Sequence, residues 1–200
     1  MVWTLPNGLT LLRIACAPVI ALLVLVGGNG HAMLAFILFT LAAGTDFLDG
    51  WLARKLGQET AIGKMLDPIA DKAMVALVIF ALAAQPGADS LVFAVPASLV
   101  ILREIMVSGL REFLGDVKLP VTQVAKFKTT AQLVALGVLL LARPLGAGDT
   151  LSSQESDANN VGHLIWMIGT GLLWLAAVLT LLSGYDYFRK GILYIREREV

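Results

Sequence analysis

Four aspartates stand close together in a hydrophobic part of this chain, and they could bind divalent metal. Asp46 and Asp49 are three residues apart, and Asp67 and Asp71 are four apart. On an α-helix, both spacings place the two side chains on one face. Each carboxylate in a bilayer costs about 2.5–3.5 kcal/mol, so four of them need a compensating partner. Clustered carboxylate oxygens suit hard cations, and we predict a site for two Mg²⁺ or Mn²⁺ ions.

The residues beside these pairs suit a phosphate-bearing ligand. Gly50 and Ala53 are small and one helical turn apart, which permits close approach of another helix or of a flat ligand. Arg54 follows, and its planar guanidinium can bind a phosphate through two hydrogen bonds. Taken alone, Gly50 and Ala53 could equally be helix-packing residues. The whole pattern, D-x2-D-G-x2-A-R-x8-G-x3-D-x3-D, is far more specific than any of its parts.

A second group of charges could hold an anionic small molecule. Arg103 and Arg111 are eight residues apart and share one broad helical face, and Lys126 and Lys128 follow at the start of the next hydrophobic stretch. We predict that these four residues form a pocket for a phosphate group, close to the aspartates. The alternative is structural, because each arginine is followed by a glutamate that could neutralise it in a salt bridge.

Composition places these groups in a membrane. Of the 200 residues, 58% are hydrophobic and only 15% are charged, whereas soluble domains carry about 25% charged residues. A span needs about 20 apolar residues, and six stretches fit. We predict an all-α integral membrane protein in which residues 1–200 form one domain. Its six transmembrane helices are expected at roughly 9–27, 32–52, 68–85, 91–112, 126–145 and 162–185.

The distribution of basic residues predicts the orientation. With six crossings, every one of the 15 Lys and Arg residues except Arg143 falls on the side of the two termini. By the positive-inside rule, that side is cytoplasmic. We therefore expect an inner (plasma) membrane protein with both termini and the active site in the cytoplasm. The net charge is zero, and no nucleic-acid partner is expected.

Features near the two ends of the chain have simpler interpretations. Asn7 precedes the first hydrophobic stretch and is expected to cap its helix. Tyr185, Tyr187 and Tyr194 are expected as anchors at the membrane interface. Residues 188–200 are amphipathic and basic, which suits a segment lying along the anionic cytoplasmic leaflet.

The aspartate pattern resembles the signature of the CDP-alcohol phosphotransferases, with every position and spacing matched. The chain is also similar to the branch of this family that uses glycerol 3-phosphate as acceptor. That similarity covers nearly the whole chain and is carried by P-N-G-L-T-L-L-R at 6–13, L-R-E-I-M-V-S-G-L-R-E-F at 102–113, A-K-F-K-T-T-A-Q at 125–132 and S-G-Y-D-Y at 183–187. It implies transfer of a phosphatidyl group from CDP-diacylglycerol to sn-glycerol 3-phosphate, with release of CMP. It also implies a homodimer of six-helix subunits.

The resemblance assigns roles residue by residue. Four residues would ligate metal: Asp46, Asp49, Asp67 and Asp71. Asp71 would also act as general base on the attacking hydroxyl. Seven residues would bind the CDP part of the lipid: Asn7, Thr10, Gly50, Ala53, Arg54, Thr60 and Gly63. For the phosphate of the acceptor, the predicted ligands are the four cations named above: Arg103, Arg111, Lys126 and Lys128.

Two other functions stay open at this point. A sibling enzyme with another acceptor would carry the same pattern: phosphatidylglycerol would make it a cardiolipin synthase, and inositol phosphate an inositol-phospholipid synthase. A divalent-cation transporter could use the aspartates as a binding site. The aspartates, however, lie toward one membrane face, and the basic residues beside them would repel a permeating cation.

Overall fold

The computed structural model describes residues 4–56, 60–85, 91–114, 123–147 and 157–198. Within these ranges, the side chains of 5–6, 46–56, 64, 123–126, 157–160 and 197–198 lie outside the description. The elements in chain order are α1 (Leu5–Val26), α2 (Asn29–Leu56), α3 (Ala61–Ala83), α4 (Leu91–Leu114), α5 (Gln123–Ala142), the 3₁₀ turn η1 (Arg143–Leu145) and α6 (Asp157–Arg198). Each predicted hydrophobic stretch corresponds to one α-helix, and the described ranges contain no strand. The all-α prediction is confirmed.

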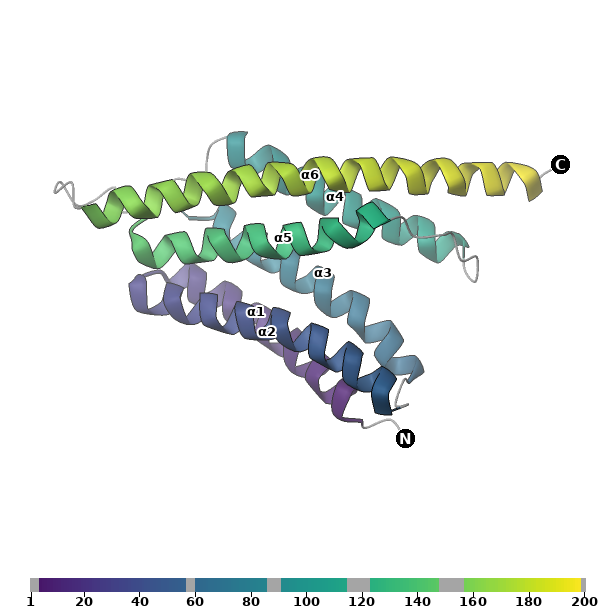
Figure 1. The fold of residues 1–200 in the computed structure, drawn as a ribbon, viewed down its shortest axis with the longest axis horizontal. Coiled ribbons are helices and arrows are strands. Elements are labelled where there is room, and N and C mark those ends of the chain that lie inside the picture. The colour runs from purple at the N-terminus through teal and green to yellow at the C-terminus, as the bar shows by residue number, and fades with distance from the viewer. Residues whose placement is uncertain (1–3, 57–59, 86–90, 115–122, 148–156, 199–200) are drawn as a thin grey trace.

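The helices form two groups, which lie close together at one end of the molecule and diverge toward the end that holds the two chain termini (Figure 1). In the first group, α1 packs against both α2 and α3. In the second, α6 packs against both α4 and α5. The groups join where α5 meets α2 and α3 and where α4 meets α3. The two ends of the chain lie toward the same end of the molecule (Figure 1).

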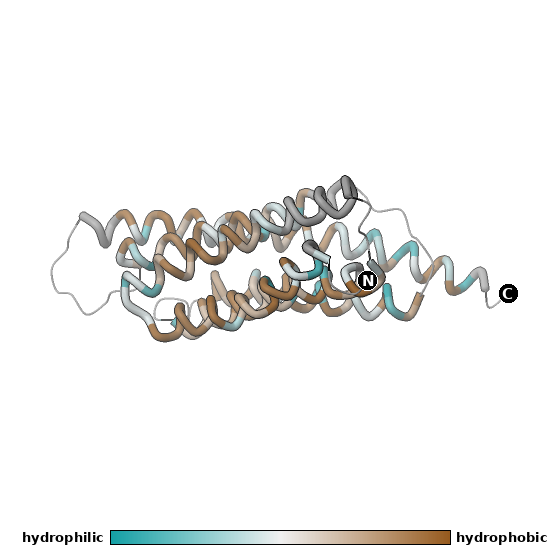
Figure 2. Tube along the Cα trace, turned by 90° about the horizontal axis from the view of Figure 1, so that it is seen from below, coloured by the Kyte–Doolittle hydropathy of each residue, from teal (hydrophilic) through white to brown (hydrophobic). Residues whose placement is uncertain are grey.

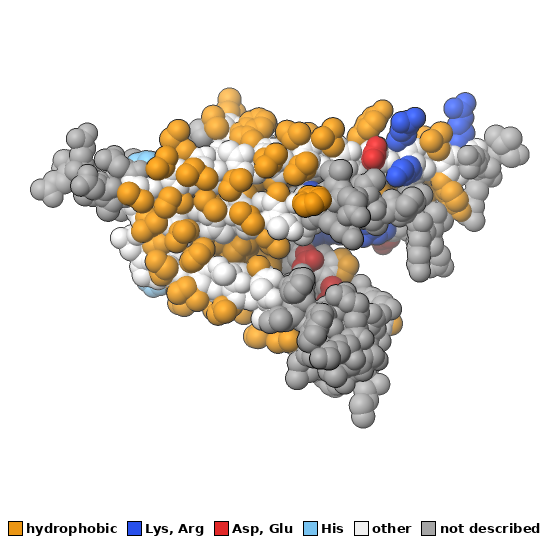
Figure 3. Space-filling view, in the orientation of Figure 1, with side chains coloured by type: hydrophobic (Ala, Val, Ile, Leu, Met, Phe, Trp, Pro, Cys, Tyr) orange, Lys and Arg blue, Asp and Glu red, His pale blue; other side chains and the backbone are white. Residues whose placement is uncertain are grey.

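The surface and composition of the helices are those of a membrane protein. Hydrophobic residues run along most of the helix lengths (Figure 2), and apolar side chains cover the middle of the molecule (Figure 3). Among the described residues, three segments are long and apolar enough to cross a membrane: Asn7–Val26, Leu91–Leu114 and Val161–Arg196. A shorter apolar segment, Asn29–Thr45, lies in α2.

A proline fixes how α4 docks on α6. Pro96 lies inside α4 and has no N–H to donate to the carbonyl of Val92, four residues earlier. Trp174 of α6 donates from Nε1 to that carbonyl at 2.8 Å. Nearby, Phe93 stacks on Trp166 with ring centroids 5.5 Å apart. A carbonyl that lost its helical partner is thereby satisfied by the neighbouring helix.

Two helix ends differ from the prediction. The prediction that Asn7 caps α1 is wrong, because the N-cap is Thr4, whose hydroxyl accepts from the Asn7 backbone N–H at 3.4 Å. Asn7 instead lies in the first turn with its side chain buried. At the other end, α6 continues without a break to Arg198. The basic segment expected along the leaflet is therefore, as far as it is described, a direct extension of the last helix (Figure 1).

Candidate active site

Three polar contacts connect the first turns of α1 to those of α3. In order along both helices, Thr60 donates to Asn7 Oδ1 at 3.0 Å, Thr10 donates to Asp67 Oδ1 at 2.8 Å, and Arg13 Nη1 lies 3.3 Å from Asp71 Oδ1. The pairing order shows that α1 and α3 run in the same direction. The residues on α1 recur every three positions and therefore share one face. Contacts along this face fix the positions of Asp67 and Asp71 relative to α1.

Thr60 starts α3, which begins earlier than the predicted span. Its hydroxyl accepts from the Gly63 backbone N–H at 3.0 Å, the usual N-cap contact. The same hydroxyl donates to Asn7, so one side chain both caps α3 and contacts α1. As a consequence, Asp67 and Asp71 lie inside the helix rather than at its start.

Gly63 is needed for the close approach of α1. A Cβ atom at this position would lie 2.6 Å from Asn7 Oδ1 and 3.2 Å from Thr60 Oγ1. Asn7 is short, buried and already bonded to Thr60, so it has little room to move. Gly63, the second glycine of the sequence pattern, therefore has a packing function in this fold.

We expect Gly63→Ala to lower the stability of the protein by about 1–3 kcal/mol, since overpacking forces neighbouring groups apart. Thermal unfolding in detergent measures this loss of stability. Gly171→Ala on α6 is the matched control, because no atom lies within 4 Å of its added Cβ. Asn7→Ala in the Gly63→Ala background should recover part of the loss by removing the clashing atom. If Gly63→Ala is as stable as Gly171→Ala, the proposed clash is wrong.

Arg13 is a site residue that the sequence analysis missed. Its side chain is 0% exposed, whereas that of its partner Asp71 is 45% exposed. The guanidinium is thus buried in the helix bundle, and the carboxylate reaches toward the cavity described next. The signal was present, because Asn7, Thr10 and Arg13 form a polar face on an otherwise apolar helix.

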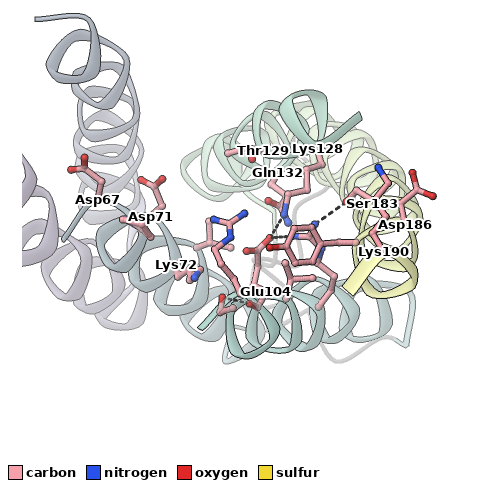
Figure 4. A pocket seen from close by; sticks show the side chains of 17 residues that line it. Asp67, Asp71, Lys72, Glu104, Lys128, Thr129, Gln132, Ser183, Asp186 and Lys190 are labelled. Atoms are coloured by element: carbon pink, nitrogen blue, oxygen red, sulfur yellow. Dashed lines mark hydrogen bonds and ion pairs between the residues drawn. The ribbon is translucent and has the colours of Figure 1, made fainter. Parts of the chain in front are cut away.

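The two aspartates border a cavity of about 330 Å³ between the two helix groups (Figure 4). Its walls come from α3, α4, α5 and α6. Its charged lining residues are Asp67, Asp71, Lys72, Arg103, Glu104, Arg111, Lys128, Asp186 and Lys190. Figure 3 shows acidic and basic side chains meeting where the surface is hollowed. Two motif aspartates and three of the four cations predicted for a phosphate therefore share one space.

The cations of the cavity are held by specific partners. Arg103 donates from Nη1 to Glu104 Oε1 at 3.1 Å and from Nη2 to Ser183 Oγ at 2.9 Å. Lys128 Nζ contacts the same glutamate oxygen at 2.5 Å. The structural alternative for Arg103, a salt bridge to its neighbouring glutamate, is therefore present, and Arg103 lines the cavity as well.

Tyr187 also lines the cavity, rather than serving only as the expected interfacial anchor. The guanidinium carbon of Arg111 lies 5.8 Å from the centroid of the Tyr187 ring, within range of a cation–π interaction. The sequence analysis missed this contribution of α6. Its only signal was S-G-Y-D-Y at 183–187.

Comparison with known proteins decides the family. A sequence model described as CDP-alcohol phosphatidyltransferase matches residues 3–182. The chain belongs to this family. The same name, CDP-diacylglycerol–glycerol-3-phosphate 3-phosphatidyltransferase, is carried by several relatives. One from Cereibacter sphaeroides is 39% identical over 222 aligned positions, covering 100% of each chain. One from Rickettsia bellii is 43% identical over 187, covering 92% of this chain and 93% of its own.

The described carboxylates of this CDP-alcohol phosphatidyltransferase are of the kind that binds a divalent metal. Asp67 and Asp71 present carboxylate oxygens one helical turn apart, and each is positioned by a donor on α1. Such outer partners orient metal ligands, and an all-oxygen set favours Mg²⁺ or Mn²⁺. The other two predicted ligands, Asp46 and Asp49, have side chains outside the description. Among the side chains that are described, no group of three potential ligands occurs.

Four further predicted ligands of the phosphatidyltransferase cannot be placed by their contacts. Gly50, Ala53 and Arg54 belong to the last turns of α2, and Lys126 belongs to the first turn of α5. Their side chains lie outside the described residues.

Proposed function

We propose that this CDP-alcohol phosphatidyltransferase transfers the phosphatidyl group of CDP-diacylglycerol to sn-glycerol 3-phosphate, giving phosphatidylglycerophosphate and CMP. The observation that carries this proposal is a cavity lined both by Asp67 and Asp71 and by Arg103, Arg111 and Lys128. Cations at this density favour an acceptor that brings its own phosphate. The names of the relatives agree with this choice of acceptor.

In the proposed reaction, Asp71 accepts the proton of the acceptor hydroxyl. As the hydroxyl oxygen bonds to the phosphorus of the phosphatidyl group, the bond from that phosphorus to the CMP oxygen breaks, and CMP leaves. Arg13 fixes the Asp71 carboxylate, and Thr10 fixes that of Asp67. Asp46, Asp49, Asp67 and Asp71 would hold Mg²⁺ or Mn²⁺, which would supply positive charge to neutralise the pyrophosphate and the departing CMP.

The CDP part of the lipid is proposed to bind beside the contacts between α1 and α3. The proposed ligands are Asn7, Thr10, Gly50, Ala53, Arg54, Thr60 and Gly63. The close packing at Gly63 supports this position, because it brings the two helices together next to Asp67. The proposed acceptor ligands, Arg103, Arg111, Lys126 and Lys128, belong to the other helix group.

We further propose six crossings of the inner membrane, with both termini and the site in the cytoplasm. Support comes from the two chain ends, which lie toward one end of the molecule (Figure 1), and from the position of Asp67 and Asp71 in the N-terminal half of α3. A site at the interface lets the acyl chains of the substrate stay in the bilayer while its head group reaches water. Following the family resemblance, the active form is proposed to be a homodimer.

CMP release from purified protein tests the proposed function. The assay supplies CDP-diacylglycerol and Mg²⁺ or Mn²⁺, with and without glycerol 3-phosphate. Release that requires both metal and this acceptor is expected, and EDTA should abolish it. Release with phosphatidylglycerol or inositol phosphate but not with glycerol 3-phosphate would assign a sibling enzyme. No release with any acceptor, together with metal uptake into proteoliposomes, would favour the transporter.

Arg111→Ala is expected to raise the KM for glycerol 3-phosphate about tenfold, because one charge-assisted phosphate contact is lost. The KM for CDP-diacylglycerol should change less than about twofold, since its proposed ligands belong to the other helix group. Steady-state CMP release at varied concentrations of each substrate measures both constants. Arg189→Ala provides the control, because Arg189 is exposed and does not line the cavity. Equal changes in both constants would indicate a purely structural arginine.

A further inference from the structure

The cavity already contains an anion among its cations. The carboxylate of Glu104 contacts both Arg103 and Lys128 through the same oxygen, Oε1. These two cations come from different helices, α4 and α5, and the glutamate joins them (Figure 4). Glu104 is therefore placed where a phosphate oxygen would have to lie in order to contact both.

Because Arg103 and Lys128 are largely buried, leaving them without an anionic partner would cost free energy. The side chains of Arg103 and Lys128 are each 9% exposed, and that of Glu104 is 21% exposed. Two buried cations without an anion would repel each other in a medium of low dielectric constant. The glutamate provides the neutralisation that the bundle needs in the absence of an acceptor.

Arg103 keeps its position independently of the glutamate. Ser183 of α6 accepts from its Nη2, and a Cβ atom on Gly184 would lie only 3.1 Å from its Cγ. Its Nε–H has no hydrogen-bond partner among the described residues. The guanidinium is thus fixed from the α6 side, while its contact with Glu104 is the one that an incoming anion can replace.

From these contacts we propose that Glu104 is an exchangeable counter-anion of the acceptor site, which rests on the proposed function of this cavity. A phosphomonoester replaces Glu104 as the partner of Lys128 Nζ and of Arg103 Nη1. The glutamate carboxylate then turns out toward the open part of the cavity. Every bound acceptor must displace this ion pair, so Glu104 lowers the affinity of the site for phosphate. It acts as an affinity-setting residue, which weakens the binding of inorganic phosphate and of a phosphomonoester acceptor alike.

Binding of inorganic phosphate and of glycerol 3-phosphate to the purified full-length protein tests this proposal without turnover. Glu104→Gln removes the charge with little change in shape. We expect it to tighten both dissociation constants by roughly three- to tenfold, the range of one ordinary hydrogen bond. The thermal stabilisation by phosphate should increase accordingly. In the CMP assay, the KM for glycerol 3-phosphate should fall by a similar factor, and that for CDP-diacylglycerol should not.

Glu112→Gln is the matched control. Glu112 also follows an arginine on α4, but it is exposed and does not line the cavity. Phosphate affinity should stay at the wild-type value in this variant. Equal tightening in both variants would show a general effect of charge and would overturn the proposal. Unchanged or weaker phosphate binding in Glu104→Gln would overturn it as well.

Glu104→Asp keeps the test decisive if Glu104→Gln does not fold. It retains the charge, but a side chain shorter by one methylene cannot maintain both contacts. A smaller tightening in the same direction is expected, and an unchanged phosphate affinity would contradict the proposal. Because phosphate binding needs neither CDP-diacylglycerol nor catalysis, its result stands even if the CMP assay assigns a different acceptor.

Discussion

Asp71→Asn is expected to reduce turnover by about 10³-fold or more while leaving binding of CDP-diacylglycerol nearly intact. The amide oxygen of asparagine can still accept from Arg13, so the contact between α1 and α3 is kept. The variant loses the ability to take a proton, and general-base catalysis alone contributes about 10²–10⁴-fold. It also loses one anionic ligand for metal, which adds to the effect.

Single-turnover CMP release measures the chemical step in Asp71→Asn, and a separate binding assay measures its affinity for CDP-diacylglycerol. Thermal unfolding checks that the variant is folded. Wild-type turnover would remove Asp71 from the role of base. Loss of lipid binding in parallel with turnover would show that the carboxylate holds the donor substrate rather than activating the acceptor.

Arg13→Gln should lower kcat by about 100-fold, with a much smaller change in either KM, because a misplaced base loses most of its effect. Arg13 is buried, but the Asp71 side chain is 45% exposed and can be hydrated once its partner is gone. We therefore expect the loss in catalysis to exceed the loss in stability. Arg13→Lys, which keeps the charge but not the planar geometry, should lie between the wild type and Arg13→Gln.

Arg143→Gln is the control for this substitution. Arg143 contacts Gln85 and does not line the cavity, so its removal should leave turnover unchanged. The comparison uses kcat per folded molecule, with unfolding curves recorded for each variant. A fall in stability without a fall in kcat for Arg13→Gln would show that Arg13 only supports the bundle.

The sequence predicted the helices well because apolar length and helix breakers are local properties. It also predicted that Asp67 and Asp71 share a face and that Arg103, Arg111 and Lys128 come near them, since charged side chains in a membrane protein avoid lipid. The contact of Arg13 with Asp71 was not predictable in this way. It depends on the relative rotation and register of α1 and α3, which hydropathy does not encode.

The contribution of α6 was missed for a different reason. In a bilayer, the faces of a helix toward lipid and toward protein are both apolar, so periodicity does not reveal which side faces inward. Tyr187 therefore looked like an interfacial anchor, although it lines the cavity and the Arg111 guanidinium lies over its ring. The start of α1 was misassigned because Thr4 and Asn7 are both good N-cap residues, and only Thr4 is followed by a proline in the first turn.

The division of the helices into two groups has a consequence for how substrate choice can change. On the proposed function, α1, α2 and α3 carry the metal ligands and the groups for the CDP-lipid, whereas α4, α5 and α6 carry those for the acceptor. The reaction then takes place at the boundary between a donor half and an acceptor half. Substitutions in the second half can alter which alcohol reacts without disturbing the chemistry of the first. Chimeras that exchange the acceptor half between family members are thus a natural route to new phospholipid head groups.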